Sequence, residues 1–307
     1  MNVGGTDTPV LGSSRSEAQL LRKAYGNTAT EKQREYFLYL PAGYESEPDR
    51  RWPVLLFLHG GGERGDGLGD LDYVLLHGPL GEAWIQHRDL PFIMIGPQLP
   101  VFGMHDQVRL RAGRPKPVRL ATGCPPRADE SWPDQPKERV MLRVSDLPST
   151  GPHAANEGAR NGMPGGWQLC ERDLLHMIDS TLQDYRADPR RVCLTGLSYG
   201  GFGTWYLAGA HPNRWAAIAP ICGGADPELA PRMAAVKMPI WAFHGGRDKW
   251  VKHHWIYEMG NALEKSGHQS FRFTVHEDLG HNSHTRVYAG EDLYQWLLSQ
   301  RLPQDRT

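Results

Sequence analysis

The sequence lacks the features that mark disulfide-rich and membrane-spanning proteins. It has only 4 cysteines in 307 residues, at Cys124, Cys170, Cys193 and Cys222, and none forms a C-x-x-C pair. This spacing argues against a cysteine-based zinc site and makes reduced thiols the expectation, while a disulfide stays open. No apolar run approaches the roughly 18 residues of a membrane-spanning helix, so this class of protein is excluded.

An excess of either charge is also missing. The chain has 34 Lys and Arg residues against 35 Asp and Glu residues, which gives a formal net charge of -1. Such a balance creates no overall field to attract nucleic acid or an anionic membrane surface, and we expect neither as a partner. The polar start of the chain lacks the basic and apolar stretches of a secretion signal, so the expected location is the cytoplasm.

Short apolar runs alternate with amphipathic segments along most of the chain. The strand pattern occurs at residues 34–40, 53–58, 92–96, 191–195, 216–220, 239–243 and 271–275. Helical spacing predicts helices at residues 167–185, 198–210, 253–266 and 291–299, with the Asp188-Pro189 turn ending the first. The alternation predicts an α/β fold, a mostly parallel sheet with helices on both faces. The length suits a single domain over residues 1–307.

Residues 101–166 interrupt this alternation. They contain 9 of the 24 prolines and show neither a strand nor a helix pattern, so we interpret them as a long insertion outside the sheet. The insertion follows the strand at 92–96, and the carboxyl ends of parallel strands border the ligand crevice of such sheets. A lid or pocket wall is one interpretation, and a disordered excursion is the other.

The turn Gly196-Leu197-Ser198-Tyr199-Gly200 is the strongest chemical signal. It lies between a predicted strand and a predicted helix. A sharp turn at this point strains the backbone of the serine, and the flanking glycines remove side chains that would collide with the strand and the helix. The hydroxyl then stands above the sheet at a helix N-terminus, which favours developing negative charge. We predict Ser198 to be a nucleophile.

A second signal is the loop His59-Gly60-Gly61-Gly62-Glu63, directly after the strand at 53–58. Acyl transfer places negative charge on a former carbonyl oxygen, which needs backbone N–H donors that no side chain shields. We predict an oxyanion hole formed by Gly61 or Gly62 together with Tyr199. A phosphate-binding loop is disfavoured because no Lys-Ser or Lys-Thr follows.

An acid and a histidine follow the serine in the order that a hydrolytic triad of this fold requires. Asp248 comes after the strand at 239–243, and His281 comes after the strand at 271–275. Both loops leave the carboxyl end of a strand, so the two side chains can converge on Ser198. His281 would accept the serine proton, and Asp248 would orient the imidazole.

Alternatives exist for each role. His284 is the rival for the base, and the rivals for the acid are Asp226, Glu228 and Asp278. Four residues are candidates for a substrate pocket, namely Glu63, Trp167, Trp250 and His284, although the tryptophans equally suit the core. The histidines lack a metal-binding spacing such as H-E-x-x-H, so we predict no metal.

These motifs resemble a known family within the α/β-hydrolase superfamily. It is the single-domain esterase group related to poly(3-hydroxybutyrate) depolymerases and feruloyl esterases, often called predicted peptidases. The resemblance covers about residues 34–298 and rests on residues 58–65, 96–98, 188–192, 196–200, 221–224 and 280–283. It implies an α/β-hydrolase fold and hydrolysis of small carboxylic esters by Ser198, His281 and Asp248 without a cofactor. The long insertion departs from the family, as does His284, where we would expect a tryptophan.

The predicted function is therefore that of a serine carboxylesterase working through an acyl-enzyme. A serine peptidase acting on short peptides would use the same triad. Oligopeptidases of this superfamily typically carry an N-terminal propeller, and the residues before His59 are too few to form one, which favours the esterase. A hydrolase fold used only for binding would lack a triad residue, and none is missing.

Overall fold

A computed structural model describes residues 15–109, 113–119, 139–141, 163, 165–252 and 254–304. Its centre is a nine-stranded sheet with the order β1-β2-β4-β3-β6-β7-β8-β9-β5. The strands are β1 (Gln19–Asn27), β2 (Lys32–Leu40), β3 (Trp52–Leu58), β4 (Ile93–Gly96), β5 (Arg139–Met141), β6 (Ala187–Leu197), β7 (Ala217–Ile221), β8 (Ile240–Gly245) and β9 (Phe271–His276). Most of them match the apolar runs of the sequence.

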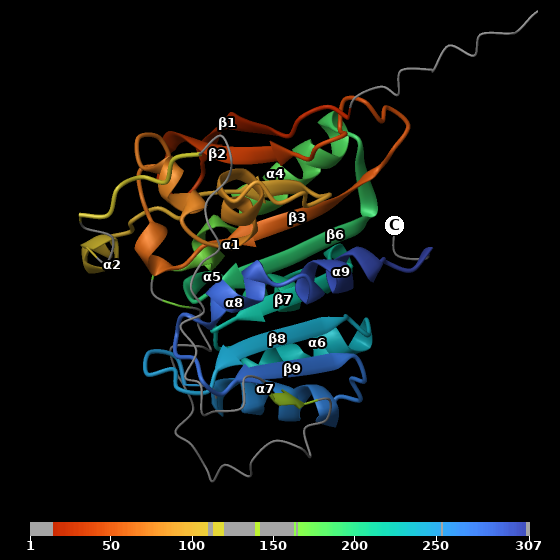
Figure 1. Ribbon diagram of the computed structural model, residues 1–307. Helices are drawn as coiled ribbons and strands as arrows, with labels where there is room; N and C mark the ends of the chain where they lie inside the picture. Colours follow the sequence, from red (N-terminus) through yellow and green to blue (C-terminus); the bar gives the residue numbers. More distant parts are fainter. Residues whose placement is uncertain are drawn as a thin grey trace, which may run out of the picture.

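Strands β4, β3, β6, β7, β8 and β9 pair in parallel, while β1, β2 and β5 are antiparallel to their neighbours. The predicted mostly parallel sheet is thus confirmed. In Figure 1 the arrowheads of β3, β6, β7 and β8 point to the same edge of the sheet. The loops that carry the predicted chemistry leave from this edge.

Helices cover both faces of the sheet (Figure 1). One face packs against α4 (Glu171–Asp184), α5 (Tyr199–Ala210), α6 (Ala230–Ala235) and α7 (His254–Lys265). The other packs against the short helices α1 (Gly78–Leu80), η2 (Leu71–Leu75) and η3 (Gly81–Ile85), and against α8 (Ser283–Ala289) and α9 (Asp292–Ser299). All seven residues of β3 are buried, because this central strand has helices on both sides.

One local prediction, the turn at Asp188-Pro189, is wrong, and the sequence pattern also misses strand β1. Strand β1 has no apolar run because it is an edge strand, paired only with β2 and carrying charged residues that protect the edge. Helix α4 ends at Asp184, before the predicted turn. The Asp188-Pro189 pair lies inside β6, where a shift of register against β3 leaves these residues out of the regular ladder and so tolerates the proline.

The segment at 101–166 is also not wholly outside the sheet. It contains helix α2 (His105–Arg109), and β5 pairs antiparallel with β9 at the edge of the sheet. Three residues are too few to show a strand period, which explains why the sequence pattern misses β5. Residues 113–119 are described as well, and most of the remaining segment, with the lid interpretation that depends on it, lies outside the described residues.

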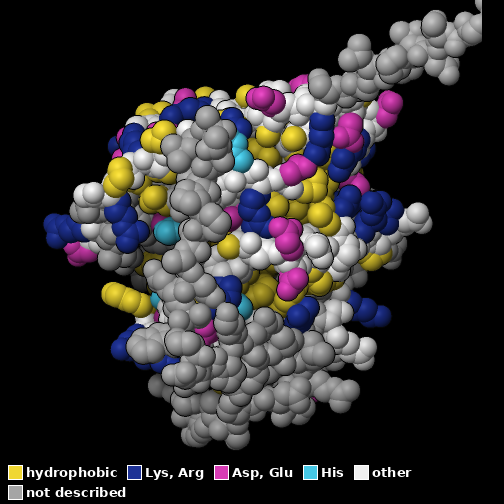
Figure 2. Space-filling view, viewed as in Figure 1, with side chains coloured by type: hydrophobic (Ala, Val, Ile, Leu, Met, Phe, Trp, Pro, Cys, Tyr) yellow, Lys and Arg dark blue, Asp and Glu magenta, His cyan; other side chains and the backbone are white. Residues whose placement is uncertain are grey.

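The described surface carries side chains of both charges (Figure 2), and three of the four cysteines are buried. On the face drawn in Figure 2, Lys and Arg side chains are intermingled with Asp and Glu side chains. None of the helices described here has the length and apolar character needed to cross a membrane. Cys170, Cys193 and Cys222 are buried free thiols, and Cys124 lies outside the described residues.

Candidate active site

Ser198 occupies a strained turn between β6 and α5. Its backbone has φ 53° and ψ -118°, a conformation that is costly for a residue with a side chain. The turn is tight because a Cβ on Gly200 would lie only 1.8 Å from the carbonyl oxygen of Leu58 in β3. The backbone N–H of Ser198 donates to Ile221 O at 2.9 Å, which ties the turn to β7. The fold therefore holds the hydroxyl at the edge where β6 ends.

A chain of hydrogen bonds joins Ser198, His281 and Asp248. The distance from His281 Nδ1 to Asp248 Oδ2 is 2.7 Å, and the distance from His281 Nε2 to Ser198 Oγ is 2.9 Å. A carboxylate only accepts, so Nδ1 carries the proton in the neutral ring, and Nε2 is left to accept from the serine hydroxyl. This arrangement can deprotonate the serine as it attacks an electrophile.

Asp248 is buried and surrounded by donors. Its Oδ1 accepts from the backbone N–H groups of Trp250 at 2.9 Å and Val251 at 3.0 Å. Burial alone raises the pKa of the Asp248 carboxyl, but hydrogen bonds from His244 and His281 outweigh this effect and hold the pKa well below its usual range. The group is therefore a carboxylate at neutral pH, able to stabilise a charged His281.

Asp248 also belongs to a group of residue types that bind metals. The ligand atoms of Cys222, His244 and Asp248 lie within 4.8 Å of one another, and all three residues are buried. Each is already engaged within the protein, since Cys222 Sγ lies 3.0 Å from Ser283 Oγ and His244 Nε2 lies 2.9 Å from Val251 O. Cys222 and His244 therefore lie beside Asp248, the acid of the hydrogen-bond chain. Their hydrogen bonds within the protein explain why the three residues lie together.

The glycine loop after β3 is anchored by His59, whose side chain is completely buried. Its Nε2 accepts from the backbone N–H of Leu99 at 2.9 Å, so the ring proton is on Nδ1, which donates to Gly60 O at 2.7 Å. Because both ring nitrogens have fixed roles, His59 is a structural residue held as the neutral imidazole. It determines the direction in which Gly60 leaves the strand.

Gln98 and Arg34 hold the far end of the same loop. The Gln98 amide donates to Glu63 O at 2.8 Å and Asp70 O at 2.7 Å, and its oxygen accepts from Gly67 N–H at 2.8 Å. Arg34 donates to the carbonyl oxygens of Gly65 and Gln98, both at 2.9 Å. Buried side chains thus replace regular secondary structure in fixing the loop.

Arg64 connects the loop to the start of α5 and to both ends of the insertion. Its guanidinium lies over the Tyr199 ring, 4.4 Å from the centroid, and donates to Pro100 O at 3.0 Å and Gly165 O at 2.6 Å. Burial lowers the pKa of Arg64, which stays a cation because its ordinary pKa is so high. One side chain therefore holds Pro100 and Gly165, the residues at the two ends of the insertion.

Tyr199, one of the predicted oxyanion-hole residues, directly follows Ser198, and Gly61 and Gly62 follow a glycine that lies beside it. Tyr199 is the first residue of α5, where backbone N–H groups have no acceptor within the helix. The 3-10 helix η1 (Gly61–Glu63) begins immediately after Gly60. A Cβ on Gly60 would lie 3.6 Å from Ser198 Cβ, so the glycine loop passes directly beside the serine.

The two tryptophans predicted for a pocket differ in their placement. Trp167 is buried and donates its indole N–H to His59 O at 3.2 Å, so it supports the glycine loop from within the core. Trp250 is 76% exposed, and its contact with Asp248 is made by the backbone. Only the Trp250 ring is open to a ligand.

Glu63 and His284, the other predicted pocket residues, lie on either side of His77. Glu63 is buried, with Oε1 3.6 Å from His77 Nε2. His284 packs its ring against His77, and its Nδ1 donates to His281 O at 3.1 Å. Ser198 is hydrogen bonded to His281, so the structure does not bring His284, the rival base, into that position.

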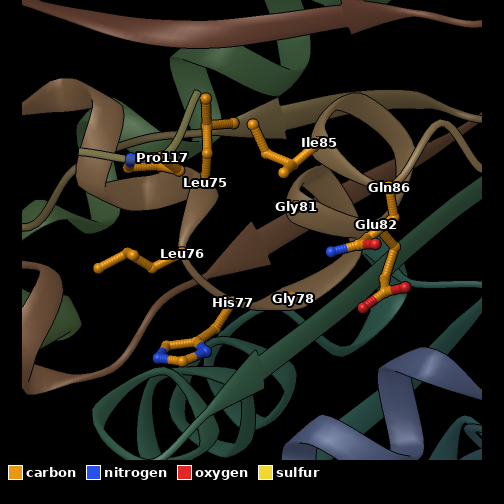
Figure 3. Close-up of a pocket in the computed structure, with 9 residues that line it drawn as sticks. All are labelled: Leu75, Leu76, His77, Gly78, Gly81, Glu82, Ile85, Gln86 and Pro117. Atoms are coloured by element: carbon orange, nitrogen blue, oxygen red, sulfur yellow. The ribbon is translucent and has the colours of Figure 1, made fainter. Parts of the chain in front are cut away.

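His77 also borders a cavity of about 80 Å³. Figure 3 shows the imidazole at one edge of this space, with Leu75, Leu76 and Pro117 on one side and Ile85 and Gln86 on the other. Pro117 comes from the described part of the insertion. One described residue of the insertion therefore lines this cavity, and its role as a wall of the substrate pocket stays a prediction.

Residues 166–230, which include Ser198, match the family described as the prolyl oligopeptidase family. A bifunctional acetylxylan esterase/xylanase of Neocallimastix patriciarum is 29% identical over 120 residues, 39% of this chain and 17% of that protein. The poly(3-hydroxyalkanoate) depolymerase C of Paucimonas lemoignei is 44% identical over 48 residues, 16% of this chain and 12% of that protein. The matches thus cover only a small part of both relatives.

Solved structures match over nearly the whole chain. A thermostable esterase aligns with a TM-score of 0.58 and 23% identity, over 92% of this chain and 63% of that chain. A ferulic acid esterase from the anaerobic fungus Anaeromyces mucronatus aligns with a TM-score of 0.54 and 14% identity, over 94% of this chain and 92% of that chain. These likenesses confirm the α/β-hydrolase fold predicted from the motifs.

Proposed function

We propose that this protein of the α/β-hydrolase fold is a serine carboxylic-ester hydrolase with Ser198, His281 and Asp248 as its catalytic triad. The observation that carries the proposal is the continuous hydrogen-bond chain from Asp248 through His281 to Ser198, which ends on a serine in a strained turn. The curated and structural relatives named as esterases support ester cleavage as the reaction.

In the first half-reaction, Ser198 Oγ attacks the carbonyl carbon of an ester while His281 Nε2 takes the hydroxyl proton. The imidazolium is stabilised by the Asp248 carboxylate. Collapse of the tetrahedral intermediate breaks the bond to the alcohol oxygen, and His281 gives its proton to that leaving group. The products are a free alcohol and an acyl-enzyme on Ser198.

In the second half-reaction, water replaces the alcohol. His281 removes a proton from the water as it attacks the acyl carbon, and then returns a proton to Ser198 Oγ. The carboxylic acid leaves, and the triad regains its starting protonation state. All groups needed for the cycle are side chains or backbone of this chain, so the proposal includes no cofactor.

Each tetrahedral intermediate carries a negative oxygen that needs donors. We assign this role to the backbone N–H of Tyr199 together with that of Gly61 or Gly62. The position of Tyr199 at the start of α5 and the passage of the glycine loop beside Ser198 support the assignment. Removing one such donor from another hydrolase costs about 10² to 10³ in kcat, so this interaction supplies a large part of the catalysis.

The test is hydrolysis of p-nitrophenyl acetate and p-nitrophenyl butyrate by the wild type and by Ser198→Ala. The wild type is expected to turn over at least one of the esters. The variant should lose about 10⁶ in kcat, as in another serine hydrolase that loses its nucleophile. A variant as active as the wild type would overturn the proposal.

A serine peptidase is the second candidate, because residues 166–230 match the prolyl oligopeptidase family. Both activities would use the same triad, so the substrates must separate them. Cleavage of aminoacyl p-nitroanilides together with inert p-nitrophenyl esters would favour the peptidase. The reverse pattern is expected here.

A further inference from the structure

His244 lies against the same oxygen of Asp248 that His281 contacts. It lies near the carboxyl end of β8, four residues before Asp248, and its side chain is completely buried. Its Nε2 is 2.9 Å from Val251 O and 3.4 Å from Asp248 Oδ2. The sequence pattern and the proposed reaction leave this histidine without a role.

The protonation of His244 follows from its neighbours. A backbone carbonyl and a carboxylate both accept hydrogen bonds, so the nitrogen between them must carry a proton. Nε2–H therefore donates to Val251 O, and the Asp248 oxygen that holds His281 lies 3.4 Å from the same nitrogen. Nδ1 is buried with no hydrogen-bond partner among the described residues, which suits a neutral ring protonated only on Nε2.

The His244 ring adds a second imidazole beside the carboxylate. Backbone N–H groups of Trp250 and Val251 hold Oδ1, while His281 and His244 approach Oδ2. The bond from His244 to Val251 O also closes the loop that supplies those backbone donors. Without His244, Oδ2 would keep a single donor and the carboxylate could rotate about its last side-chain bond.

We infer that His244 is a positioning residue that holds the Asp248 carboxylate in the orientation that His281 requires. The inference rests on the proposed function, because the triad is where the effect would be felt. His244 touches neither Ser198 nor a substrate in this arrangement; it acts through Asp248. A carboxylate free to turn would present its lone pair to Nδ1 for only part of the time, and general-base catalysis would slow accordingly.

The experiment compares three substitutions of His244 in p-nitrophenyl butyrate hydrolysis. His244→Gln can place an amide N–H near the position of Nε2, whereas the shorter side chain of His244→Asn cannot, and His244→Leu has no donor. We expect His244→Gln to keep kcat within about threefold of the wild type. The other two should lose roughly 10- to 100-fold in kcat with KM unchanged, in the range seen when outer hydrogen-bond partners are removed from other sites.

His268 provides a matched control. It is also a buried histidine with Nε2 on a backbone carbonyl, Met238 O at 2.7 Å, but it lies just before β9, at the other end of the sheet. His268→Leu should lower Tm without changing kcat. If the His244 variants and the His268 variant lose kcat in the same proportion to their loss of Tm, then His244 has only a structural role, and the inference is overturned.

A double-mutant cycle tests whether the effect passes through the acid. In an Asp248→Ala background, His244→Leu should cost less than about twofold further in kcat, since there is no carboxylate left to orient. Equal losses with and without Asp248 would contradict the inference. A wild type without Ser198-dependent activity would instead refute the proposed function, so the two failures are distinguishable.

Discussion

At the scale of single residues, the site combines residues with a strained backbone, Ser198 and Cys222, with several that are fixed by hydrogen bonds. The backbone of Ser198 is held at positive φ, which costs on the order of 1–3 kcal/mol. His59 and Asp248, by contrast, have each acceptor or donor matched to a named partner. The strained backbone of Ser198 thus lies among neighbours that are held by hydrogen bonds.

Replacement of the acid tests the role assigned to Asp248. Asp248→Asn should keep the fold but present an amide N–H₂ or a weaker acceptor to His281, which favours the wrong tautomer. We expect kcat to fall by about 10⁴, as for the corresponding change in another triad. Asp226→Asn is the control, because Asp226 only caps a short helix through Glu228 N–H. Equal kcat values for the two variants would contradict the assignment.

Replacement of Gly200 tests how tightly the turn at Ser198 is packed. An added methyl group would meet the Leu58 backbone at 1.8 Å, and backbone atoms cannot rotate away. We expect Gly200→Ala to lower Tm by at least about 5 °C, because overpacking of this kind costs 1–3 kcal/mol or more. Gly69→Ala, whose new Cβ would make an ordinary contact at 3.5 Å, should leave Tm nearly unchanged. Similar thermal melts for both variants would show that the turn is less constrained than described.

For single residues, the sequence predicts the candidate triad better than the residues that hold the triad in place. Ser198, His281 and Asp248 are predictable because each follows a recognisable strand in the required order. Their joint hydrogen-bond chain agrees with that prediction in geometry. His244 is not found in this way, because a lone histidine at a strand end has no distinctive spacing, although its place four residues before the acid is a usable signal.

At the scale of elements, the loops matter more than the helices and strands they join. The glycine loop after β3 has only the short η1 as regular structure, and buried side chains from β2 and from the segment after β4 hold it. The structure gives a physical role to Gln98 of the motif Gly96-Pro97-Gln98, one of the motifs that resemble the family pattern. Gln98 ties together three points of the loop that passes beside Ser198.

Gln98→Leu should therefore impair catalysis from a distance. The loop would lose three hydrogen bonds, and a shift of about 1 Å in the predicted oxyanion donors can cost about 10²-fold. We expect kcat/KM for p-nitrophenyl butyrate to fall by 10- to 100-fold. Gln295→Leu, at an exposed position in α9, serves as the control and should be neutral. Unchanged kinetics in Gln98→Leu would mean that the loop does not depend on this side chain.

The loop that carries His281 is held by an ion pair between Asp278 and Arg286. Both guanidinium N–H groups donate to the carboxylate at 2.8 Å. This contact lowers the pKa of Asp278 below its usual value, although burial opposes the shift. A depressed pKa in the folded state means that the pair adds stability above the unfolded-state pKa of about 3.9, and that this stability is lost as pH falls through the folded-state pKa.

Thermal melts of the wild type and Asp278→Asn over a range of pH check this pair. The variant should have the lower Tm at pH 7, and the difference should shrink as the pH drops below about 4, where Asp278 of the unfolded wild-type chain begins to take up a proton, and vanish once the folded carboxyl is protonated as well. A Tm difference that does not change with pH would show that the charge of Asp278 contributes nothing to stability.

At the scale of the whole molecule, the parallel strands bring distant residues together. Ser198, Asp248 and His281 follow β6, β8 and β9, and these strands end at one edge of a single sheet (Figure 1). The sequence predicts this arrangement because buried central strands are continuous apolar runs. It does not predict β1 or β5, which lie at the edges of the sheet, where one strand is polar and the other has three residues.

The most direct test of the central claim is covalent labelling with a fluorophosphonate, followed by peptide mapping of the labelled protein. Such reagents react with serines activated by a neighbouring base. We expect one labelled peptide, carrying the adduct on Ser198, and no labelling of Ser198→Ala. An unlabelled wild type, or an adduct on a different serine, would contradict the claim that Ser198 is the nucleophile.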